Sequence, residues 1–383
     1  MFEDDKKIKV KQKMKKEVHK RYMQLALELA KKAEGKTSPN PLVGAVIVKN
    51  GKIIGKGFHE KAGKPHAEIN AINSVKDKRQ LKGSTLYVNL EPCCHYGKTG
   101  PCTDEIIKSG IKEVYIAMLD PNPMNNGKGL AKLKKAGIKV NLGLMEKEAR
   151  KLNEFFIKFI TTKKPFVMMK TAMSLDGKIA TKTGHSKWIS CRESREHVHK
   201  LRNIVDAIIV GINTILKDDP RLTTRLNIKE GNNPLRIVLD STLKIPLKAR
   251  VLDNNNVMIA TTSRCSKKKK KILEKKGIKV VIVKSKNKKV DLNELMKKLA
   301  LMGVTSVMIE GGSEVNASAL EAGIVDKIIY FIAPIIIGGK NAKTAVGGRG
   351  IKYLNETIKL REIKVKKIGS DMMVEGYIDE KKH

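Results

Sequence analysis

Aromatic residues, cysteines and long apolar runs are scarce in this chain, and each scarcity excludes a class of protein. Aromatic residues make up 4% of the 383 residues, which leaves few rings on which nucleic-acid bases could stack. Three of the five cysteines crowd into one segment and two are isolated, so no disulfide framework is expected. The longest apolar run, 328–337, contains Pro334 and is too short to cross a bilayer. The first seven residues lack the apolar core of a signal peptide. We therefore expect a protein of the reducing cytoplasm with no membrane partner.

Acidic residues are also few relative to basic ones. The chain has 78 Lys and Arg against 39 Asp and Glu, a formal net charge of +39 at pH 7. Clustered basic residues attract phosphates and would suggest nucleic acid as a partner. The lysines are spread over both halves, however, so we interpret the charge as a solvated surface that attracts anionic small molecules. Nucleic acid is not the expected partner, and weak RNA binding or a compositional bias stays the alternative.

The length and the 41% content of hydrophobic residues are enough for two domains, each with its own core. We predict a frayed basic extension over 1–16, a first domain over 17–145, a connecting helix and linker over 146–164, and a second domain over 165–383. Strand and helix patterns alternate through both halves, which indicates an α/β fold class with a mixed first sheet and a largely parallel second sheet.

Individual elements follow from local patterns. The spacing of apolar residues predicts a helix over 17–33, and Asn50-Gly51 predicts a two-residue hairpin. A single connecting helix is predicted over 146–160. Ser190 is expected to cap a helix, and Asp291 with Glu294 to form a capping box.

His66, Cys93 and Cys102 have the residue types of a catalytic zinc site, in which three N or S ligands leave the fourth tetrahedral position to water. Zinc lowers the pKa of that water, and a carboxylate that is not a ligand must carry its proton to the leaving group. Glu68 is the candidate for this role. Cys94 adjoins Cys93 and stays an alternative ligand, although the position directly after Glu-Pro favours Cys93.

Helix starts are expected at both halves of this motif. Pro65 suits the first position of a helix over 66–75, and a second helix is expected to start at Pro101-Cys102. The positive end of a helix dipole lowers the pKa of a thiol toward the thiolate that zinc requires.

A second candidate site follows the apolar stretch 304–309, where Glu310-Gly311-Gly312-Ser313 leads directly into a helix over 314–322. Glycines let the backbone approach a phosphate, and the free N–H groups of a helix start can bind it. The Gly-x-Gly-x-x-Gly fingerprint is absent, so a Rossmann dinucleotide site is not predicted.

These motifs together resemble a known family. The segment E-P-C-C-H-Y-G-K-T-G-P-C, preceded by H-A-E, resembles the deaminase half of bifunctional riboflavin-biosynthesis deaminase/reductases, within the zinc-dependent cytidine-deaminase-like superfamily. Eight residues separate Cys93 from Cys102, which departs from the C-x-x-C of nucleic-acid-editing deaminases. K-T-A-M-S-L-D-G-K-I-A, V-G-I-N-T-I-L-K-D-D-P-R-L-T-T-R and I-E-G-G-S resemble the reductase half. The resemblance implies an N-terminal cytidine-deaminase-like α/β/α domain and a C-terminal dihydrofolate-reductase-like α/β domain.

The resemblance also implies two cofactors, Zn²⁺ and NADPH, and a phosphoribosylated pyrimidine as substrate. The implied NADPH contacts are Ala172, Trp188, Thr214, Asp218, Ser241, Gly312, Ser313, Glu314, Val315, Asn316, Ala317 and Ser318. The implied substrate contacts are Ser186, Arg202, Leu222, Arg225 and Glu310 in the second half, with Asn40 and His59 in the first.

The physical properties of these residues suggest more specific roles. Arg202 and Arg225 could fork onto a ribose phosphate, as guanidinium geometry favours. Lys170 lies in a predicted strand between apolar neighbours, where an unpaired ammonium is costly, so we hypothesise that it pairs with Glu310 and polarises the opened ribose.

The predicted function is therefore hydrolytic deamination of a diaminopyrimidinone followed by NADPH-dependent reduction of its ribosyl group, in a protein expected to form homo-oligomers. A deaminase acting on RNA bases and a zinc-stabilised binding protein without catalysis are the two alternatives.

Overall fold

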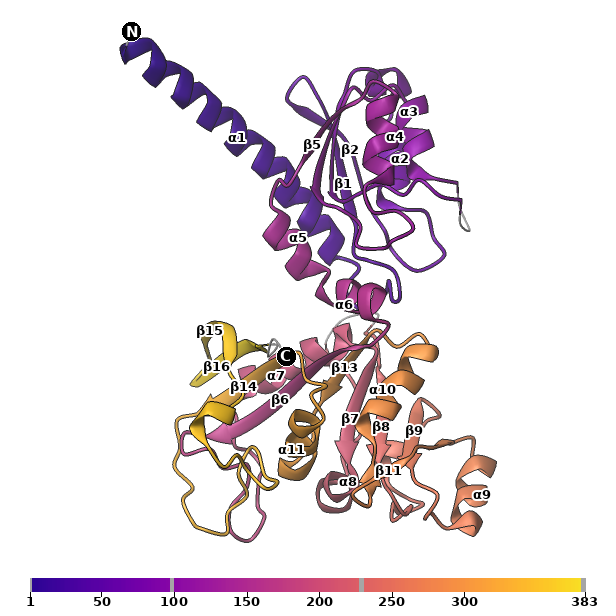
Figure 1. Ribbon diagram of the computed structural model, residues 1–383, viewed down its shortest axis with the longest axis vertical. Coiled ribbons are helices and arrows are strands. Elements are labelled where there is room, and N and C mark those ends of the chain that lie inside the picture. The colour runs from indigo at the N-terminus through magenta and orange to yellow at the C-terminus, as the bar shows by residue number, and fades with distance from the viewer. Residues whose placement is uncertain (1, 97–99, 227–230, 380–383) are drawn as a thin grey trace. The chain divides into compact units, whose positions relative to one another are not determined.

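A computed structural model describes residues 2–96, 100–226 and 231–379 of the chain (Figure 1). The chain divides into two compact units, Met1–Thr162 and Lys163–His383. The boundary falls at the end of the segment that was predicted as the linker.

The first unit is built on a five-stranded mixed sheet. Its strands run in the order β2-β1-β3-β4-β5, with β1 antiparallel to both neighbours and the remaining pairs parallel. The strands are β1 (Gly44–Lys49), β2 (Lys52–Phe58), β3 (Thr85–Leu90), β4 (Glu113–Met118) and β5 (Lys139–Leu142).

Helices cover both faces of this sheet. Figure 1 shows α1 (Phe2–Lys31) and α5 (Glu146–Leu152) on one face, and α2 (Ala67–Ser74), α3 (Cys102–Lys108) and α4 (Lys128–Lys135) on the other. A short 3₁₀ turn, Lys78–Leu81, precedes β3, and α6 (Glu154–Thr162) ends the unit.

The hairpin between β1 and β2 has the predicted two-residue turn. Lys49 pairs with Lys52, and the two residues between them, Asn50 and Gly51, have φ values of 49° and 74°. Positive φ at both central positions is the geometry that Asn-Gly favours.

Two predictions about helices in this unit are wrong. Residues 2–16 belong to the continuous helix α1, because the lysines that dominate this segment form helices readily even without an apolar stripe. The single helix predicted over 146–160 is broken between α5 and α6 at Asn153, whose side chain accepts from the Leu42 N–H at 2.8 Å and donates to the Leu42 carbonyl at 3.0 Å.

The second unit is built on a nine-stranded sheet in the order β10-β9-β8-β7-β13-β6-β14-β16-β15. All neighbours are parallel except β14-β16 and β16-β15, so the predicted largely parallel sheet is confirmed. The strands are β6 (Phe166–Ser174), β7 (Ala207–Gly211), β8 (Leu235–Leu239), β9 (Val257–Thr261), β10 (Lys279–Ile282), β13 (Ser306–Ile309), β14 (Lys327–Ala333), β15 (Leu360–Ile368) and β16 (Asp371–Ile378), with β11 (Ser285–Lys286) and β12 (Lys289–Val290) in a separate ribbon.

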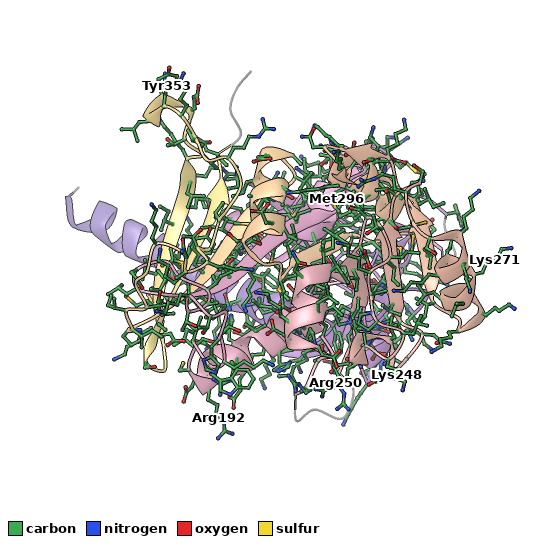
Figure 2. The ribbon with its side chains drawn as sticks, turned by 90° about the horizontal axis from the view of Figure 1, so that it is seen from below. Arg192, Lys248, Arg250, Lys271, Met296 and Tyr353 are labelled. Carbon is green, nitrogen blue, oxygen red and sulfur yellow. The ribbon has the colours of Figure 1, made fainter. Side chains whose placement is uncertain are left out.

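Apolar residues of α10, among them Leu295, Met296 and Leu299, pack in one buried cluster with residues of β7, β8, β9 and β13. Figure 2 shows Met296 on α10, whereas Arg192 and Lys271 project outward at the periphery. The helices of this unit are α7 (Arg192–Ile204), α8 (Ile212–Asp218), α9 (Lys267–Lys275), α10 (Leu292–Leu301) and α11 (Ser313–Glu321), with 3₁₀ turns at Arg250–Leu252 and Leu354–Glu356.

Of two predicted caps, one differs from the observed cap and the other is confirmed only in part. Cys191, not Ser190, caps α7, and its sulfur accepts from the Ser194 N–H at 3.5 Å. Asp291 caps α10 as predicted, but the capping box is only half formed, because the Glu294 carboxylate accepts from the Lys284 N–H instead.

Among the described residues, no helix is both long and apolar enough to span a bilayer.

Candidate functional sites

The structure brings the side chains of His66, Cys93 and Cys102 together. His66 caps the N-terminus of α2, Cys102 begins α3, and Cys93 lies in the loop that follows β3. Their ligand atoms lie within 4.8 Å of one another, and His66 Nδ1 is 3.5 Å from Cys93 Sγ and 3.3 Å from Cys102 Sγ. Ligand atoms bonded to one tetrahedral zinc at about 2.0–2.3 Å stand roughly 3.5 Å apart, so this set fits the metal.

Cys94 is not part of this group. Its backbone N–H donates to the Asn125 side chain at 3.0 Å, and its sulfur is not among the clustered ligand atoms. The geometry therefore favours Cys93 over Cys94, as the position after Glu-Pro indicated.

The ionisable groups around His66, Cys93 and Cys102 favour the binding of a cation. The hydrogen bond from the Cys102 thiol lowers the pKa of Cys93 to about 4, and the same contact raises the pKa of Cys102. Burial raises the pKa of Glu68, which is 3% exposed, to about 7. Two sulfurs and a carboxylate crowded in a region of low dielectric cannot all ionise without a positive partner. The donor chemistry as well as the spacing thus fits Zn²⁺.

Asn40 and His59 lie beside this group. His59 is buried, and its ring centroid is 5.4 Å from that of His66. His59 Nδ1 donates to the Pro65 carbonyl and Nε2 accepts from the Asn40 side chain, both at 3.1 Å. A carbonyl can only accept, so this pairing requires a proton on Nδ1. Burial lowers the pKa of His59, which favours the same neutral ring. Their contact with substrate stays a prediction.

In the second unit, Glu310 forms a bidentate ion pair with Arg202. Glu310 follows β13, and the Arg202 guanidinium reaches its two oxygens at 2.7 and 2.9 Å. The two side chains are 9% and 11% exposed. Although burial opposes it, the charge of Arg202 and its hydrogen bonds lower the pKa of Glu310 to about 2.

This pair bears on two sequence-based expectations. The fork of Arg202 reaches a carboxylate of its own chain, and a contact of Arg202 with the substrate stays a prediction. Lys170 and Glu310 attract each other electrostatically, and the two hydrogen bonds described at the Glu310 oxygens come from Arg202. Burial lowers the pKa of Lys170, and the charge of Glu310 partly opposes this shift. The ammonium lies 5.8 Å from the centroid of the Phe331 ring.

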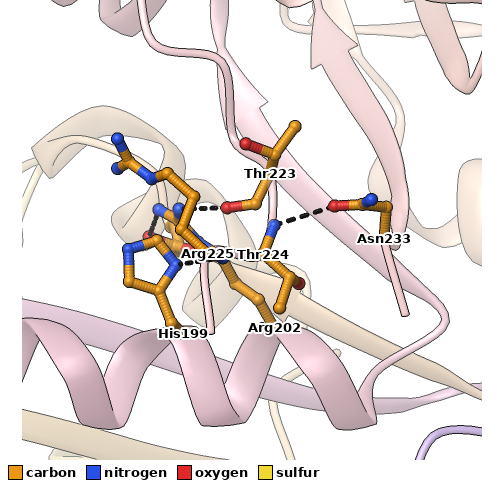
Figure 3. A network of polar contacts seen from close by, with 7 residues as sticks. His199, Arg202, Thr223, Thr224, Arg225 and Asn233 are labelled. Carbon is orange, nitrogen blue, oxygen red and sulfur yellow. Dashed lines mark hydrogen bonds and ion pairs between the residues drawn. The ribbon is translucent and has the colours of Figure 1, made fainter. Parts of the chain in front are cut away.

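Arg202 and His199 hold the segment that carries Arg225. Arg202 donates to the Thr223 carbonyl at 3.1 Å, and the Arg225 N–H donates to His199 Nδ1 at 3.2 Å (Figure 3). Partial desolvation and the charges of neighbouring arginines lower the pKa of Arg225, which is nevertheless exposed. Arg225 thus stays the better candidate for a phosphate contact. Sequence reasoning missed His199, although its three-residue spacing from Arg202 on one helix places the two on the same face.

The two glycines of the turn before α11 have different structural roles. A Cβ at Gly311 would lie 2.6 Å from the Val315 Cβ, whereas a Cβ at Gly312 would meet nothing within 4 Å. Gly311 is therefore required for packing, and Gly312 leaves open space at the helix start. Asn316 is fully buried, and its side-chain nitrogen donates to Thr171 Oγ1 at 3.1 Å, whereas its side-chain oxygen has no hydrogen-bond partner among the described residues. Its contact with NADPH stays a prediction.

The other residues implied as NADPH or substrate contacts lie on several elements. Ala172 is in β6, Thr214 and Asp218 are in α8, Ser241 follows β8, and Leu222 is buried in the loop after α8. Trp188 is 68% exposed, with the Arg195 guanidinium 4.6 Å from its ring centroid, and Ser186 lies two residues before it. Ser313, Glu314, Val315 and Ser318 are in α11 with the buried Ala317. Their roles stay predictions.

Comparisons with known proteins match both units. Residues 16–118 match the cytidine and deoxycytidylate deaminase zinc-binding region, and residues 165–374 match the RibD C-terminal domain. The riboflavin biosynthesis protein RibD of Aquifex aeolicus (strain VF5) is 47% identical over 358 residues, which cover 94% of this chain and 98% of that protein. RibD of Escherichia coli (strain K12) is 36% identical over 363 residues, covering 92% and 97%.

Solved structures also match this chain over nearly its whole length. Acinetobacter baumannii RibD, form 1, superposes with a TM-score of 0.85 at 36% identity, covering 95% of this chain and 100% of that one. A diaminohydroxyphosphoribosylaminopyrimidine deaminase/5-amino-6-(5-phosphoribosylamino)uracil reductase from Thermotoga maritima gives 0.83 at 40% identity, covering 95% and 99%.

The buried ion pair generates a prediction about stability. Replacing Arg202 in Arg202→Met leaves the Glu310 carboxylate buried without its fork, so the free energy of unfolding of the second unit should fall by about 3–5 kcal/mol at pH 7. In the wild type, the depressed pKa of Glu310 stabilises the fold above the unfolded value of about 4.3, and this stabilisation is lost as pH falls toward 2. The variant should show a smaller acid-side loss.

Hydrogen exchange of the β7 and β13 amides in a urea series measures this unit by itself. Arg192→Met removes an exposed pair with Glu196 on the same helix and serves as the control, with a change of about 0.5 kcal/mol or less. Equal exchange in the wild type and in Arg202→Met across the pH range would contradict the assigned role of the pair.

Proposed function

The chain belongs to the family of bifunctional riboflavin-biosynthesis deaminase/reductases, and on this premise we propose how its residues divide the two reactions. The predicted family, fold class and cofactors are confirmed: the first unit is a zinc-dependent deaminase and the second an NADPH-dependent reductase. The deaminase converts 2,5-diamino-6-(5-phosphoribosylamino)pyrimidin-4(3H)-one to 5-amino-6-(5-phosphoribosylamino)uracil, and the reductase converts the ribosyl group to ribityl. The observation that supports the first assignment best is the convergence of three ligand atoms beside a buried carboxylate.

In the deaminase, His66, Cys93 and Cys102 hold the zinc. When bound, the metal lowers the pKa of a water so that it can attack the ring carbon near neutral pH. Glu68 takes the proton of that water and delivers it to the departing amine. A pKa of about 7 suits a group that must both accept and release a proton at neutral pH. Asn40 and the neutral His59 are proposed to position the pyrimidine.

In the reductase, NADPH supplies a hydride to the ribosyl carbon. The open N-terminus of α11 at Gly312 binds a phosphate of the cofactor, and Arg225 binds the phosphate of the substrate. The Arg202–Glu310 pair fixes the wall of the site, and the Lys170 ammonium polarises the oxygen of the opened ribose.

We also propose a cytoplasmic homo-oligomer. β15 is the last strand of the nine-stranded sheet, and most of its residues are exposed. Ile363 and Val365 are 57% and 62% exposed, and exposed apolar side chains on an edge strand favour association, whereas Arg361, Lys364, Lys366 and Lys367 on the same strand oppose it. A second copy of the chain bound along β15 would cover both.

The role of Glu68 predicts separable activities. Glu68→Gln should lower ammonia release about 10²- to 10⁴-fold, because an amide cannot accept the proton from the water and pass it to the amine. Bound zinc, measured by metal analysis, should stay stoichiometric, and reduction of an already deaminated substrate should be unchanged.

Glu105→Gln alters an exposed glutamate in the first turn of α3 and is the matched control. Ammonia release by Glu68→Gln at the rate of this control would remove the proposed role.

The role of Lys170 predicts a change in turnover. Lys170→Met keeps an apolar chain of similar length but removes the ammonium, so kcat for NADPH oxidation should fall at least tenfold while ammonia release persists. NADPH oxidation with the deaminated substrate measures it, and Lys286→Met, at an exposed residue of β11, is the control. Unchanged kcat in Lys170→Met would exclude the role.

The interface at β15 predicts a change in assembly. Val365→Lys places a charge on the apolar face of the strand and should convert the oligomer to a smaller species, measured by size-exclusion chromatography with light scattering. Lys364→Gln, at the neighbouring position, should leave the mass unchanged. An unaltered mass of Val365→Lys would place the interface elsewhere.

A further inference from the structure

The buried side chain of Asn125 forms hydrogen bonds with the backbone on both sides of Cys93. Asn125 lies in the loop between β4 and α4 and is fully buried. Its side-chain oxygen accepts from the Cys94 N–H at 3.0 Å, and its side-chain nitrogen donates to the Pro92 carbonyl at 3.4 Å. One amide thus joins the two residues that flank the zinc ligand.

The orientation of this amide is determined by its partners. The side-chain nitrogen of Asn125 also donates to the Asp120 carboxylate at 3.2 Å. A carboxylate and a carbonyl only accept while a backbone N–H only donates, so a flipped amide would lose all three hydrogen bonds. The Asn125 backbone is held as well, since its N–H donates to the Asn122 carbonyl at 2.9 Å and its carbonyl accepts from Lys128 at 2.7 Å.

The loop that carries Asn125 is tied to the zinc loop a second time. The carboxylate of Glu91, which is 3% exposed, accepts the backbone N–H groups of Asp120, Gly127 and Leu130 at 3.1, 3.0 and 3.0 Å. Glu91 and Asn125 therefore connect the segment around Pro92 and Cys93 to the loop between β4 and α4.

We propose that Asn125 is a positioning residue that sets the zinc affinity of the deaminase site through Cys93, an inference that rests on the ligand assignment made above. The Asn125 amide ties the peptide groups before and after Cys93, and the Cys93 carbonyl accepts from the Thr103 N–H at 3.1 Å. The sulfur is then held near the other two ligands before metal binds, so less conformational freedom is lost on binding. Loss of an outer partner of a metal ligand typically costs about 10–100-fold in metal affinity.

The test compares Asn125→Leu with Asn126→Leu in the full chain. Both variants carry the same substitution on neighbouring loop residues, but Asn126 is exposed. Competition with a chromogenic chelator gives the Kd for zinc, which should rise about 10–100-fold in Asn125→Leu and stay at the wild-type value in Asn126→Leu. Raising free zinc above the new Kd should restore much of the ammonia release of Asn125→Leu, with KM unchanged.

Hydrogen exchange of the β1 and β3 amides separates positioning from folding. Retained protection in Asn125→Leu together with weaker zinc binding supports the proposal. An unchanged zinc Kd overturns it, and so does loss of protection throughout both strands, because Asn125 would then act on the stability of the whole unit. Failure of the wild type itself to bind zinc would instead overturn the ligand assignment, which is a different result.

Discussion

The deaminase unit depends on one electrostatic constraint: two sulfurs, an imidazole and a carboxylate meet where little water can screen them. The Cys102 thiol, and after it His66, stabilise Cys93 as a thiolate, and burial raises the pKa of Glu68. A bound dication would resolve this conflict, because its charge would allow both sulfurs to ionise beside the carboxylate. The surrounding structure keeps the groups from moving apart, with the starts of α2 and α3 supplying His66 and Cys102.

In the reductase unit, the buried Glu310 carboxylate is paired with the permanent positive charge of Arg202. Glu310 is somewhat less buried than Glu68, and Arg202 provides it with a fixed cation, so the pKa of Glu310 is lowered whereas that of Glu68 is raised. A carboxylate that stays ionised cannot shuttle protons near neutral pH. Glu310 is therefore better suited to holding Arg202 in place than to proton transfer. The partly exposed Lys170 is then left with a lowered pKa and without a close carboxylate among the described contacts, consistent with a role toward the substrate.

Sequence reasoning was successful where chemistry and spacing are local. The zinc residues could be found because few residue types bind zinc, and the turn at Asn50-Gly51 because positive φ restricts composition. It failed where a distant partner decides the outcome. The break at Asn153 depends on Leu42, and the partner of Glu310 lies 108 residues away in sequence. Asn125 belongs to the same class, since its function is evident only once the loop after β4 is placed against Cys94.

The division into two units has a genetic consequence. Each unit has its own sheet, and in the described residues neither sheet takes a strand from the other unit. A lesion in one core therefore removes no strand from the sheet of the other. If the uracil intermediate passes between molecules, two defective alleles, one damaged before Thr162 and one after Lys163, would complement each other in the same cell, and the intermediate would accumulate only when the second kind is present alone.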